Sequence, residues 1–297
     1  MAIFLFFLPA GLVFFGLPMI SELAFRIGAI DLPDGVRKLH TGAIPRLGGL
    51  WIFSSFALSA LVLALFGNAD GALLFPLLCG GALTVAFGVA DDIFTLPPGV
   101  KFGLQTTVAA LTVTLLPDDG VLGLRAPAAA VFLLRVGLLL LFMNAVNFSD
   151  GADGLACLYV LIAALSLVLR SATPDAGLLF LLLAFCLVGF LPANLPSASI
   201  YLGDSGSQVL GLLLGVGILS LPGGGKPSDL LLLALPIADL LFAVLRRLSS
   251  GRAPWSADRG HIHHLLADRG LSPWQVLGVL SLCALCFAAL SLVLAAV

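Results

Sequence analysis

Long apolar segments alternate with short polar ones along almost the whole chain. Each apolar run is about long enough to cross the ~30 Å hydrocarbon core of a bilayer as a helix. The runs lie near residues 2–20, 48–67, 72–90, 102–117, 127–146, 155–170, 177–193, 206–222, 229–245 and 273–296. With 60 % apolar and only 10 % charged residues, the chain is far more apolar than an average soluble domain. The pattern predicts an all-α polytopic integral membrane protein with about ten transmembrane helices.

The charges between the runs indicate how the helices are threaded. Ten crossings from an outside N-terminus place both termini outside and divide the connecting segments into an inside and an outside set. The inside set carries ten lysines and arginines and the outside set three, a bias that fits the positive-inside rule. We therefore expect a multi-pass protein of the inner (plasma) membrane with cytoplasmic segments at 21–47, 91–101, 147–154, 194–205 and 246–272.

No soluble domain or repeat interrupts this pattern, so residues 1–297 are expected to form a single transmembrane domain surrounded by membrane lipid. The first run lacks a basic leader and a small-residue cleavage site, which predicts a retained helix. The net charge of −2, with the arginines spread over separate loops, excludes a basic groove for nucleic acid. The five cysteines are best interpreted as small packing residues.

The residues that can carry chemistry gather at the inside ends of the apolar runs. Asp91 and Asp92 end one run, and Asp204 begins another. A carboxylate near a bilayer is costly unless it has water, a cation or a partner, so several at one face indicate an active site. Carboxylates beside imidazoles suggest a divalent metal together with phosphate groups.

Asp91 and Asp92 are followed ten residues later by Lys101, with no other charge between them. Adjacent carboxylates repel one another and favour a cation beside them, and a lysine can bind phosphate. A solvated helix end is the simpler alternative, because surface turns use aspartate freely. We favour a site that binds metal and phosphate together.

A second polar group recurs at every third residue between two apolar runs, at Asn144, Asn147, Asp150 and Asp153. On a helix or a helix-like turn these side chains converge on one stripe. The glycine after Asp150 and that after Asp153 allow close approach of a nucleotide or phosphate. A capped turn between helices would explain one or two of the four side chains but hardly all of them.

Tyr201 and Asp204 lie in a turn rich in glycine and serine that opens a further helix. The unpaired N–H groups and positive dipole of a helix N-terminus favour phosphate or metal-phosphate at this point. An ordinary helix cap is the alternative interpretation of Asp204.

Three of the four histidines, His261, His263 and His264, lie close together near Arg252 and Arg259. Imidazoles bind transition metals, but a hard metal held by carboxylates would leave them to contact phosphate oxygens. We favour phosphate contact.

The first inside segment adds His40 and Arg46. Basic residues beside a membrane often do no more than face anionic lipid headgroups. Asp239, within the ninth run near Pro236, is expected to pair with a neighbour or to form part of the wall of the site.

Together these segments resemble the polyprenyl-phosphate N-acetylhexosamine-1-phosphate transferases, the WecA/MraY family, from about Asp31 to Gly270. The most specific motifs are Arg37-Lys38-x-His40, Asp91-Asp92, Asn144-x-x-Asn147-x-x-Asp150-Gly-x-Asp153-Gly-Leu, Gly203-Asp204-Ser-Gly-Ser, Pro236-x-x-Asp239 and His261-Ile-His-His. The histidine segment looks like the WecA branch, which uses UDP-GlcNAc. It looks less like the MraY branch, which uses UDP-MurNAc-pentapeptide.

The resemblance implies transfer of a sugar-1-phosphate from a UDP-N-acetylhexosamine to polyprenyl (undecaprenyl) phosphate, with release of UMP, to initiate cell-envelope polysaccharide synthesis. It implies that Asp204 and Asn147 hold Mg²⁺, with Mn²⁺ as a substitute, and that Asp91 orients or deprotonates the lipid phosphate. Asp153 and Tyr201 would bind the uracil. The other substrate-binding residues would be Lys101, Arg252, Arg259, His261, His263, His264, His40 and Arg46, and Asp92 and Asp150 would complete the catalytic set.

Two other functions stay open. A phospho-MurNAc-pentapeptide transferase is the alternative within the family. An ion-coupled secondary transporter is the alternative from another class, because intramembrane carboxylates also form ion pathways. Transport predicts charges near mid-span and inverted repeats. The main mid-span charges are Arg135 and Asp239, and we find no repeat. Assembly as a homodimer also stays open.

Overall fold

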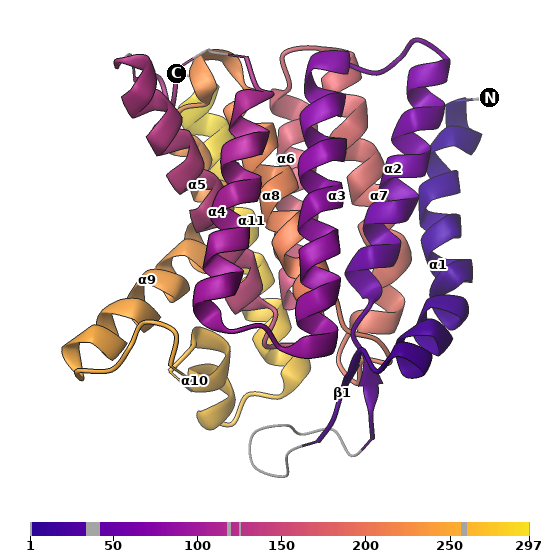
Figure 1. Ribbon diagram of the computed structural model, residues 1–297, viewed down its shortest axis with the longest axis vertical. Coiled ribbons are helices and arrows are strands. Elements are labelled where there is room, and N and C mark those ends of the chain that lie inside the picture. Colours follow the sequence, from indigo (N-terminus) through magenta and orange to yellow (C-terminus); the bar gives the residue numbers. More distant parts are fainter. Residues whose placement is uncertain (1, 34–41, 118–119, 125, 257–259, 297) are drawn as a thin grey trace.

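The computed structural model describes residues 2–33, 42–117, 120–124, 126–256 and 260–296. Its long helices run side by side as a bundle, with a small hairpin at one end (Figure 1). The helices are α1 (Ala2–Ile27), α2 (Gly48–Leu65), α3 (Gly71–Phe94), α4 (Pro98–Thr114), α5 (Ala128–Ser149), α6 (Leu155–Arg170), α7 (Pro174–Asn194), α8 (Gly203–Leu219), α9 (Ala234–Ser249), α10 (Ile262–Asp268) and α11 (Pro273–Ala296). The 3-10 helices η1 (Pro222–Gly224) and η2 (Pro227–Leu233) precede α9.

The apolar runs of the sequence become these long helices. Within the described part of the chain, seven helical segments are long and apolar enough to cross a membrane, and α9 reaches that length together with η2. The helices α6 and α8 are apolar but shorter, at 16 and 17 residues. The chain is therefore an all-α polytopic membrane protein, as the sequence predicted.

The connecting segments separate into two ends of the bundle. At the lower end in Figure 1 lie α10 and the strands β1 (Ile30–Asp31) and β2 (Ile44–Pro45), which pair antiparallel. At the opposite end, Arg170 forms an ion pair with Asp229, and the Lys226 ammonium donates to the Ala295 carbonyl at 2.8 Å. The beginning of α1 and the end of α11 lie at this opposite end (Figure 1).

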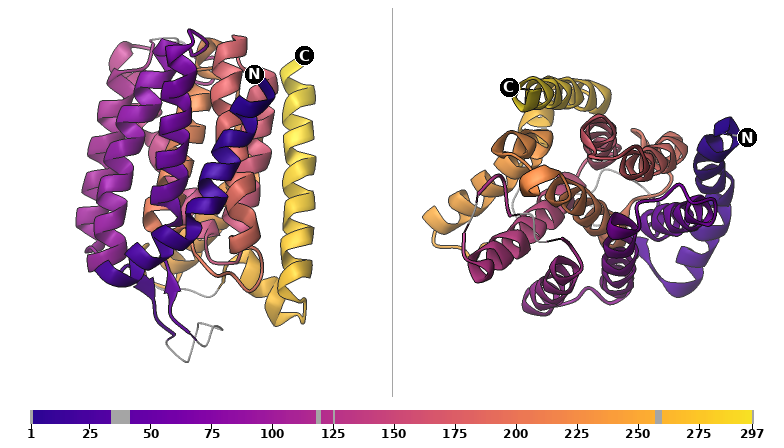
Figure 2. Two further views of the ribbon diagram at one scale, coloured as in Figure 1. Left: turned by 90° about the vertical axis from the view of Figure 1, so that its right-hand side faces the viewer. Right: turned by 90° about the horizontal axis from the view of Figure 1, so that it is seen from above.

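Helix α8 runs through the middle of the bundle with other helices around it (Figure 2). All of its residues from Ser205 to Leu219 are buried. Its small residues allow close approach of its neighbours. A Cβ added at Gly49 of α2 would lie 1.9 Å from the Gly206 Cα, and one added at Gly88 of α3 would lie 2.4 Å from the Ser205 Cα. Such contacts between small residues are typical of membrane helices, where packing drives association.

One expected position is confirmed and one needs correction. Asp91 and Asp92 end a helix, as the sequence predicted, because they lie in the last turns of α3, which continues to Phe94. Arg135 was expected to be a charge near mid-span. Its guanidinium instead reaches the segment before α5, where it donates to the carbonyls of Gly120 at 2.8 Å and Pro117 at 2.6 Å. Long basic side chains reach the end of a membrane helix in this way, so Arg135 stabilises a turn at the end opposite the hairpin.

Gly49→Ala is expected to destabilise the protein by about 1–3 kcal/mol, toward the upper end of that range. The reason is that the new methyl group meets the backbone of α8, which cannot move aside. Gly11→Ala in α1 is the control, because among the described residues no atom beyond its own stretch of helix lies within 4 Å of the added Cβ. Thermal unfolding in detergent measures both variants. Equal melting temperatures would contradict the close contact between α2 and α8.

Candidate active site

A lysine joins two of the aspartates singled out in the sequence. The Lys101 Nζ lies 2.7 Å from Asp91 Oδ2 and 2.5 Å from Asp204 Oδ1, so that α4 is tied to α3 and α8. Asp91 also closes the turn between α3 and α4, because its Oδ1 accepts from the backbone N–H of Leu96 at 2.7 Å. Thr95 adopts a left-handed conformation there, with φ of 52°. This tight turn places Lys101 next to Asp91.

Asp92 caps the N-terminus of α8. Its two carboxylate oxygens accept from the backbone N–H groups of Asp204 at 2.7 Å and Ser205 at 3.0 Å. Gly203 precedes them with φ of +73°, and a Cβ there would lie 2.0 Å from the Arg46 carbonyl oxygen. Only glycine fits this position without strain. The cap fixes the direction in which the Asp204 side chain projects from α8.

Asn147, near the end of α5, brings a third helix to Asp204. Its amide nitrogen donates to Asp204 Oδ1 at 2.6 Å and to Ser207 Oγ at 2.9 Å. Asp204 Oδ1 therefore accepts from both Lys101 and Asn147.

Arg46 lies on the other side of the same carboxylate. One guanidinium nitrogen is 3.6 Å from Asp204 Oδ2, and others are 3.7 Å from Asp92 and 3.7 Å from Asp31. Arg46 follows β2, and the adjacent main chain pairs with the segment before α8, since Gly48 donates to the Tyr201 carbonyl at 3.0 Å. The pair of strands β1 and β2 thus places the guanidinium of Arg46 at the site.

Asp150 directly follows α5 and belongs to the same group of charges. Burial raises the pKa of its carboxyl well above the usual value, and Asp204, Asp92 and Asp153 raise it further, whereas Arg46 lowers it. Burial beside other carboxyl groups therefore favours the neutral form of Asp150, and a bound cation would favour its ionised form.

Asp153 and Tyr201 lie at the edge of this group. Asp153 Oδ2 accepts from the backbone N–H groups of Ser197 at 3.0 Å and Ala198 at 3.1 Å, so this oxygen holds the turn before α8. Burial raises the pKa of the Tyr201 phenol, and the nearby carboxylates of Asp153 and Asp31 add to this effect. The tyrosine is therefore neutral at physiological pH and can offer an uncharged ring.

The histidine segment is attached to the bundle through Asp239. Its carboxylate lies 3.0 Å from His261 Nδ1 and accepts from the backbone N–H of Ile262 at 2.9 Å, which caps α10. The His261 ring packs edge-on against Phe148, and the guanidinium of Arg247 lies 5.2 Å from the centroid of the same aromatic ring. The sequence left two roles open for Asp239, and pairing with a neighbour is confirmed.

His263 lies against the turn that carries Asp150 and Asp153. A Cβ at Gly151 would lie 2.8 Å from its ring, and the ring centroids of His263 and His264 are 4.3 Å apart. Burial lowers the pKa of His263 to about 4, helped by His264 and His261 and opposed by Asp239. His263 is therefore neutral near pH 7. Its Nε2 is buried and has no hydrogen-bond partner within the described part of the chain.

Of the expected substrate-binding residues, one is seen away from this arrangement and two cannot be placed. His40 and Arg259 lie outside the described residues. Arg252 is exposed beyond the end of α9, and no contact of its side chain with the carboxylates is seen among the described residues.

An amide layer that was not predicted from the sequence lies next to the charges. Gln105 and Gln208 are buried and hydrogen-bonded to each other at 2.9 Å, and Asn144 bonds Gln105 at 3.0 Å. A signal was present, because Gln105 lies four residues after Lys101 and Gln208 four residues after Asp204. Residues four apart share one face of a helix.

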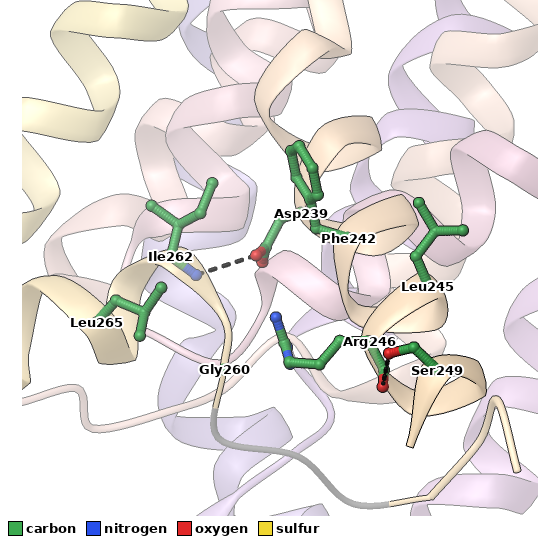
Figure 3. A pocket seen from close by; sticks show the side chains of 8 residues that line it. All are labelled: Asp239, Phe242, Leu245, Arg246, Ser249, Gly260, Ile262 and Leu265. Carbon is green, nitrogen blue, oxygen red and sulfur yellow. Dashed lines mark hydrogen bonds between the residues drawn. The ribbon is translucent and has the colours of Figure 1, made fainter. Parts of the chain in front are cut away.

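A pocket of about 480 Å³ lies between α9 and α10, beside Asp239 (Figure 3). Its apolar side chains come from both helices, and Arg246 projects toward it together with Asp239 (Figure 3). The lining residues are Asp239, Phe242, Leu245, Arg246, Ser249, Gly260, Ile262 and Leu265. The pocket combines an apolar wall with charged groups, as a site for an amphipathic molecule requires.

The oxygen donors of the site fit a divalent cation. Asp91, Asp92, Asp150 and Asp204 are accompanied by Lys101 and Arg46, and these oxygen donors are the ligand type that magnesium prefers. Among the described residues, no group of three or more histidine, cysteine, aspartate or glutamate side chains is arranged as a complete ligand set for a metal. A metal here would therefore rely on substrate oxygens and water for the rest of its ligands.

The known proteins that this chain is similar to agree with one another in the reaction that their names describe. Residues 74–221 match the model of glycosyl transferase family 4. The chain is 31 % identical to a decaprenyl-phosphate N-acetylglucosaminephosphotransferase of Mycobacterium tuberculosis, over 91 % of this chain and 77 % of the relative. It is 32 % identical to an undecaprenyl-phosphate alpha-N-acetylglucosaminyl 1-phosphate transferase of Thermotoga maritima, over 90 % and 82 %. A probable undecaprenyl-phosphate N-acetylglucosaminyl 1-phosphate transferase of Bacillus subtilis is 31 % identical, over 86 % and 74 %.

Asp92→Asn is expected to destabilise the protein by about 2 kcal/mol, because both oxygens of Asp92 accept from backbone N–H groups and an amide can replace only one of them. Asp70→Asn is the matched control. Asp70 caps α3 at the opposite end through Oδ1, while its Oδ2 accepts only a long bond of 3.4 Å from the exposed Thr173 hydroxyl, and asparagine caps helices about as well as aspartate. Melting temperatures in detergent compare the two variants, and equal losses would contradict the double cap.

Proposed function

The chain belongs to glycosyl transferase family 4, and from this premise we propose that it transfers N-acetylglucosamine-1-phosphate, or a related N-acetylhexosamine-1-phosphate, from a UDP-sugar to a polyprenyl phosphate. The product would be the lipid-linked sugar pyrophosphate that begins a cell-envelope polysaccharide. The observation that carries the proposal is the contact of Lys101 with Asp91 and Asp204 at one end of a membrane bundle. The printed names of the similar proteins supply the substrate class.

In the proposed reaction, an oxygen of the lipid phosphate attacks the β-phosphorus of the UDP-sugar. The new P–O bond joins lipid and sugar phosphates, and the bond to the bridging oxygen breaks so that UMP leaves. A phosphate is already nucleophilic at neutral pH, so the protein must chiefly position the groups and neutralise their charges. Lys101 and Arg46 lie on either side of Asp204 and would perform this neutralisation.

Mg²⁺, or Mn²⁺ in its place, would be held by Asp204 and Asn147. Asn147 presents its amide nitrogen to Asp204, so its amide oxygen is the atom that would bind the metal. The bound ion would supply further positive charge against the pyrophosphate. Asp92 and Asp150 would complete the polar shell around these ligands.

The nucleotide would lie over the turn before α8. Tyr201 offers a neutral ring for stacking on uracil, and Asp153 would bond the edge of the base. His261, His263 and His264 would contact phosphate as N–H donors, a role that the neutral state of His263 permits. The remaining phosphate contacts would come from Arg252, Arg259 and His40.

The lipid acceptor would approach from the side of α9. The pocket between α9 and α10 has apolar walls at Phe242, Leu245 and Leu265 and a cation at Arg246, which matches an isoprenoid chain with a phosphate head. Asp91 would orient or deprotonate that phosphate, because it lies beside Lys101 at the end of α3. We further propose ten membrane crossings, both termini outside and the site at the cytoplasmic face of the inner membrane.

The reaction itself is the first prediction of this function. Purified protein with UDP-GlcNAc, undecaprenyl phosphate and Mg²⁺ should release UMP, lose activity in EDTA and regain it with Mg²⁺ or Mn²⁺. Competition among UDP-GlcNAc, UDP-GalNAc and UDP-MurNAc-pentapeptide should favour UDP-GlcNAc. Selective use of the pentapeptide would overturn the donor but not the reaction class, and full activity in EDTA would overturn the metal.

Asp91→Asn is expected to bind donor and Mg²⁺ nearly as the unaltered protein does, yet to turn over at least ~100-fold more slowly, the scale for a positioned acid-base group. The amide keeps the acceptor for Leu96 but removes the charge beside Lys101. Rates and donor affinity are measured together, with Asp70→Asn as control. Lost donor binding would instead assign Asp91 to the metal.

The orientation is tested with single cysteines in a variant whose five native cysteines are replaced. A membrane-impermeant thiol reagent added from outside should reach a cysteine in place of Asn68 and not one in place of Gly99, because the positive-inside rule puts Gly99 in the cytoplasm. Both positions are exposed and lie at opposite ends of the bundle. The reverse labelling pattern would invert the protein.

A further inference from the structure

The buried amide layer beneath the charged site consists of Gln105 of α4, Gln208 of α8 and Asn144 of α5. Gln105 is 1 % exposed and Gln208 is fully buried. Gln105 Nε2 donates to Gln208 Oε1 at 2.9 Å, and Gln105 Oε1 accepts from Asn144 Nδ2 at 3.0 Å. Asn144 is held in turn by the carbonyl of Leu140 at 2.8 Å.

The amide layer lies one helical turn away from Lys101, Asp204 and Asn147, here called the charged layer. The same three helices contribute one residue to each layer. Helix α4 contributes Lys101 to one layer and Gln105 to the other, and α8 contributes Asp204 and Gln208. Helix α5 contributes Asn147 and Asn144 in the same way. The two layers meet where Gln208 Nε2 donates to Asp204 Oδ1 at 3.4 Å.

The carboxylate of Asp204 at one end and the Leu140 carbonyl at the other set the direction of the shorter bonds in the amide layer, and Gln105 Nε2 makes a further, longer bond to Asn144 Oδ1 at 3.4 Å. An ionised carboxylate only accepts hydrogen bonds, so Gln208 must turn its nitrogen toward Asp204 and its oxygen toward Gln105. Gln105 must then present its nitrogen to Gln208 and its oxygen to Asn144. A chain of donors with one polarity therefore ends at Asp204 Oδ1.

Simple helix pairing does not require this arrangement. Buried amides are costly unless their partners are complete, and small residues also bring membrane helices together without them. What the chain of amides adds is a fixed donor on one oxygen of Asp204. That oxygen is kept on the side of Lys101 and Asn147, and the other oxygen is left 3.6 Å from Arg46.

We propose that Gln105 and Gln208 are positioning residues for the transfer reaction, which hold Asp204 in the orientation that its charged partners need. The inference rests on the proposed function in its kinetic test, whereas a second test does not require activity. Of the two glutamines, Gln208 is the one that bonds Asp204, so Gln105 acts through Gln208.

The test is a double-mutant cycle with methionine, which matches the length of glutamine without its amide. Gln208→Met and Gln105→Met should each lower kcat about fivefold to tenfold, the scale of one lost hydrogen bond, with KM for the UDP-sugar within about twofold. The double variant should be no slower than Gln208→Met, because the proposal has Gln105 act through Gln208. Losses that multiply in the double variant, or single variants as fast as the unaltered protein, would overturn the proposal.

A second readout does not depend on activity. The chain has only three lysines, Lys38, Lys101 and Lys226, so acetylation of each by a small amine-reactive ester can be followed by mass spectrometry. Loosening Asp204 should raise labelling of Lys101 severalfold relative to Lys226 in both single variants. Thr107→Val is the control, since this exposed α4 hydroxyl bonds only the Gly103 carbonyl at 3.0 Å.

The two proposals fail in different ways. An unaltered protein that releases no UMP while Lys101 becomes reactive in the glutamine variants would overturn the transferase assignment and keep the positioning role. An active protein in which Lys101 labelling is the same in all variants would keep the transferase and overturn the positioning role.

Discussion

The carboxylate of Asp204 stands at the start of a buried helix, and the site around it depends on how that charge is satisfied. Lys101 of α4 and Asn147 of α5 donate to one of its oxygens, and Arg46 lies near the other. Its own backbone N–H is bound by Asp92 of α3. An isolated charge in an apolar surrounding is strongly unfavourable. The helices that carry these partners therefore have to meet at the same end of the bundle.

That meeting requires backbones that come unusually close. Membrane helices gain little from hydrophobic burial against one another, so tight packing of small residues has to hold them. Gly49 and Gly88 provide it where α2 and α3 contact the first turn of α8. The same contact brings Asp92 within reach of two backbone N–H groups of α8. Packing and charge placement are thus parts of one arrangement.

The two ends of the bundle use charge differently. At the end that bears the termini, Arg170 pairs with Asp229, and Arg135 binds main-chain carbonyls. These charged groups have partners within the protein and stabilise the contacts of helices and turns. At the other end, four aspartates outnumber two cations, and the imidazole of His263 is buried beside them. Among the described residues, this end gathers carboxyl groups that a bound metal would help to neutralise.

The sequence by itself determined the apolar runs, the all-α membrane class and the aspartates, lysine and asparagine of the site, because hydrophobic length and motif spacing are properties of a single segment. It also placed Gln105 on the face of Lys101, a signal that went unused. Only the tertiary structure decided that Asp92 caps α8 and that Asp239 pairs with His261. It alone showed that Gln208 bonds Gln105. Periodicity shows which side chains share a helix face, but it does not tell which helices are neighbours. That depends on how small residues and buried polar groups from distant segments fit together in space.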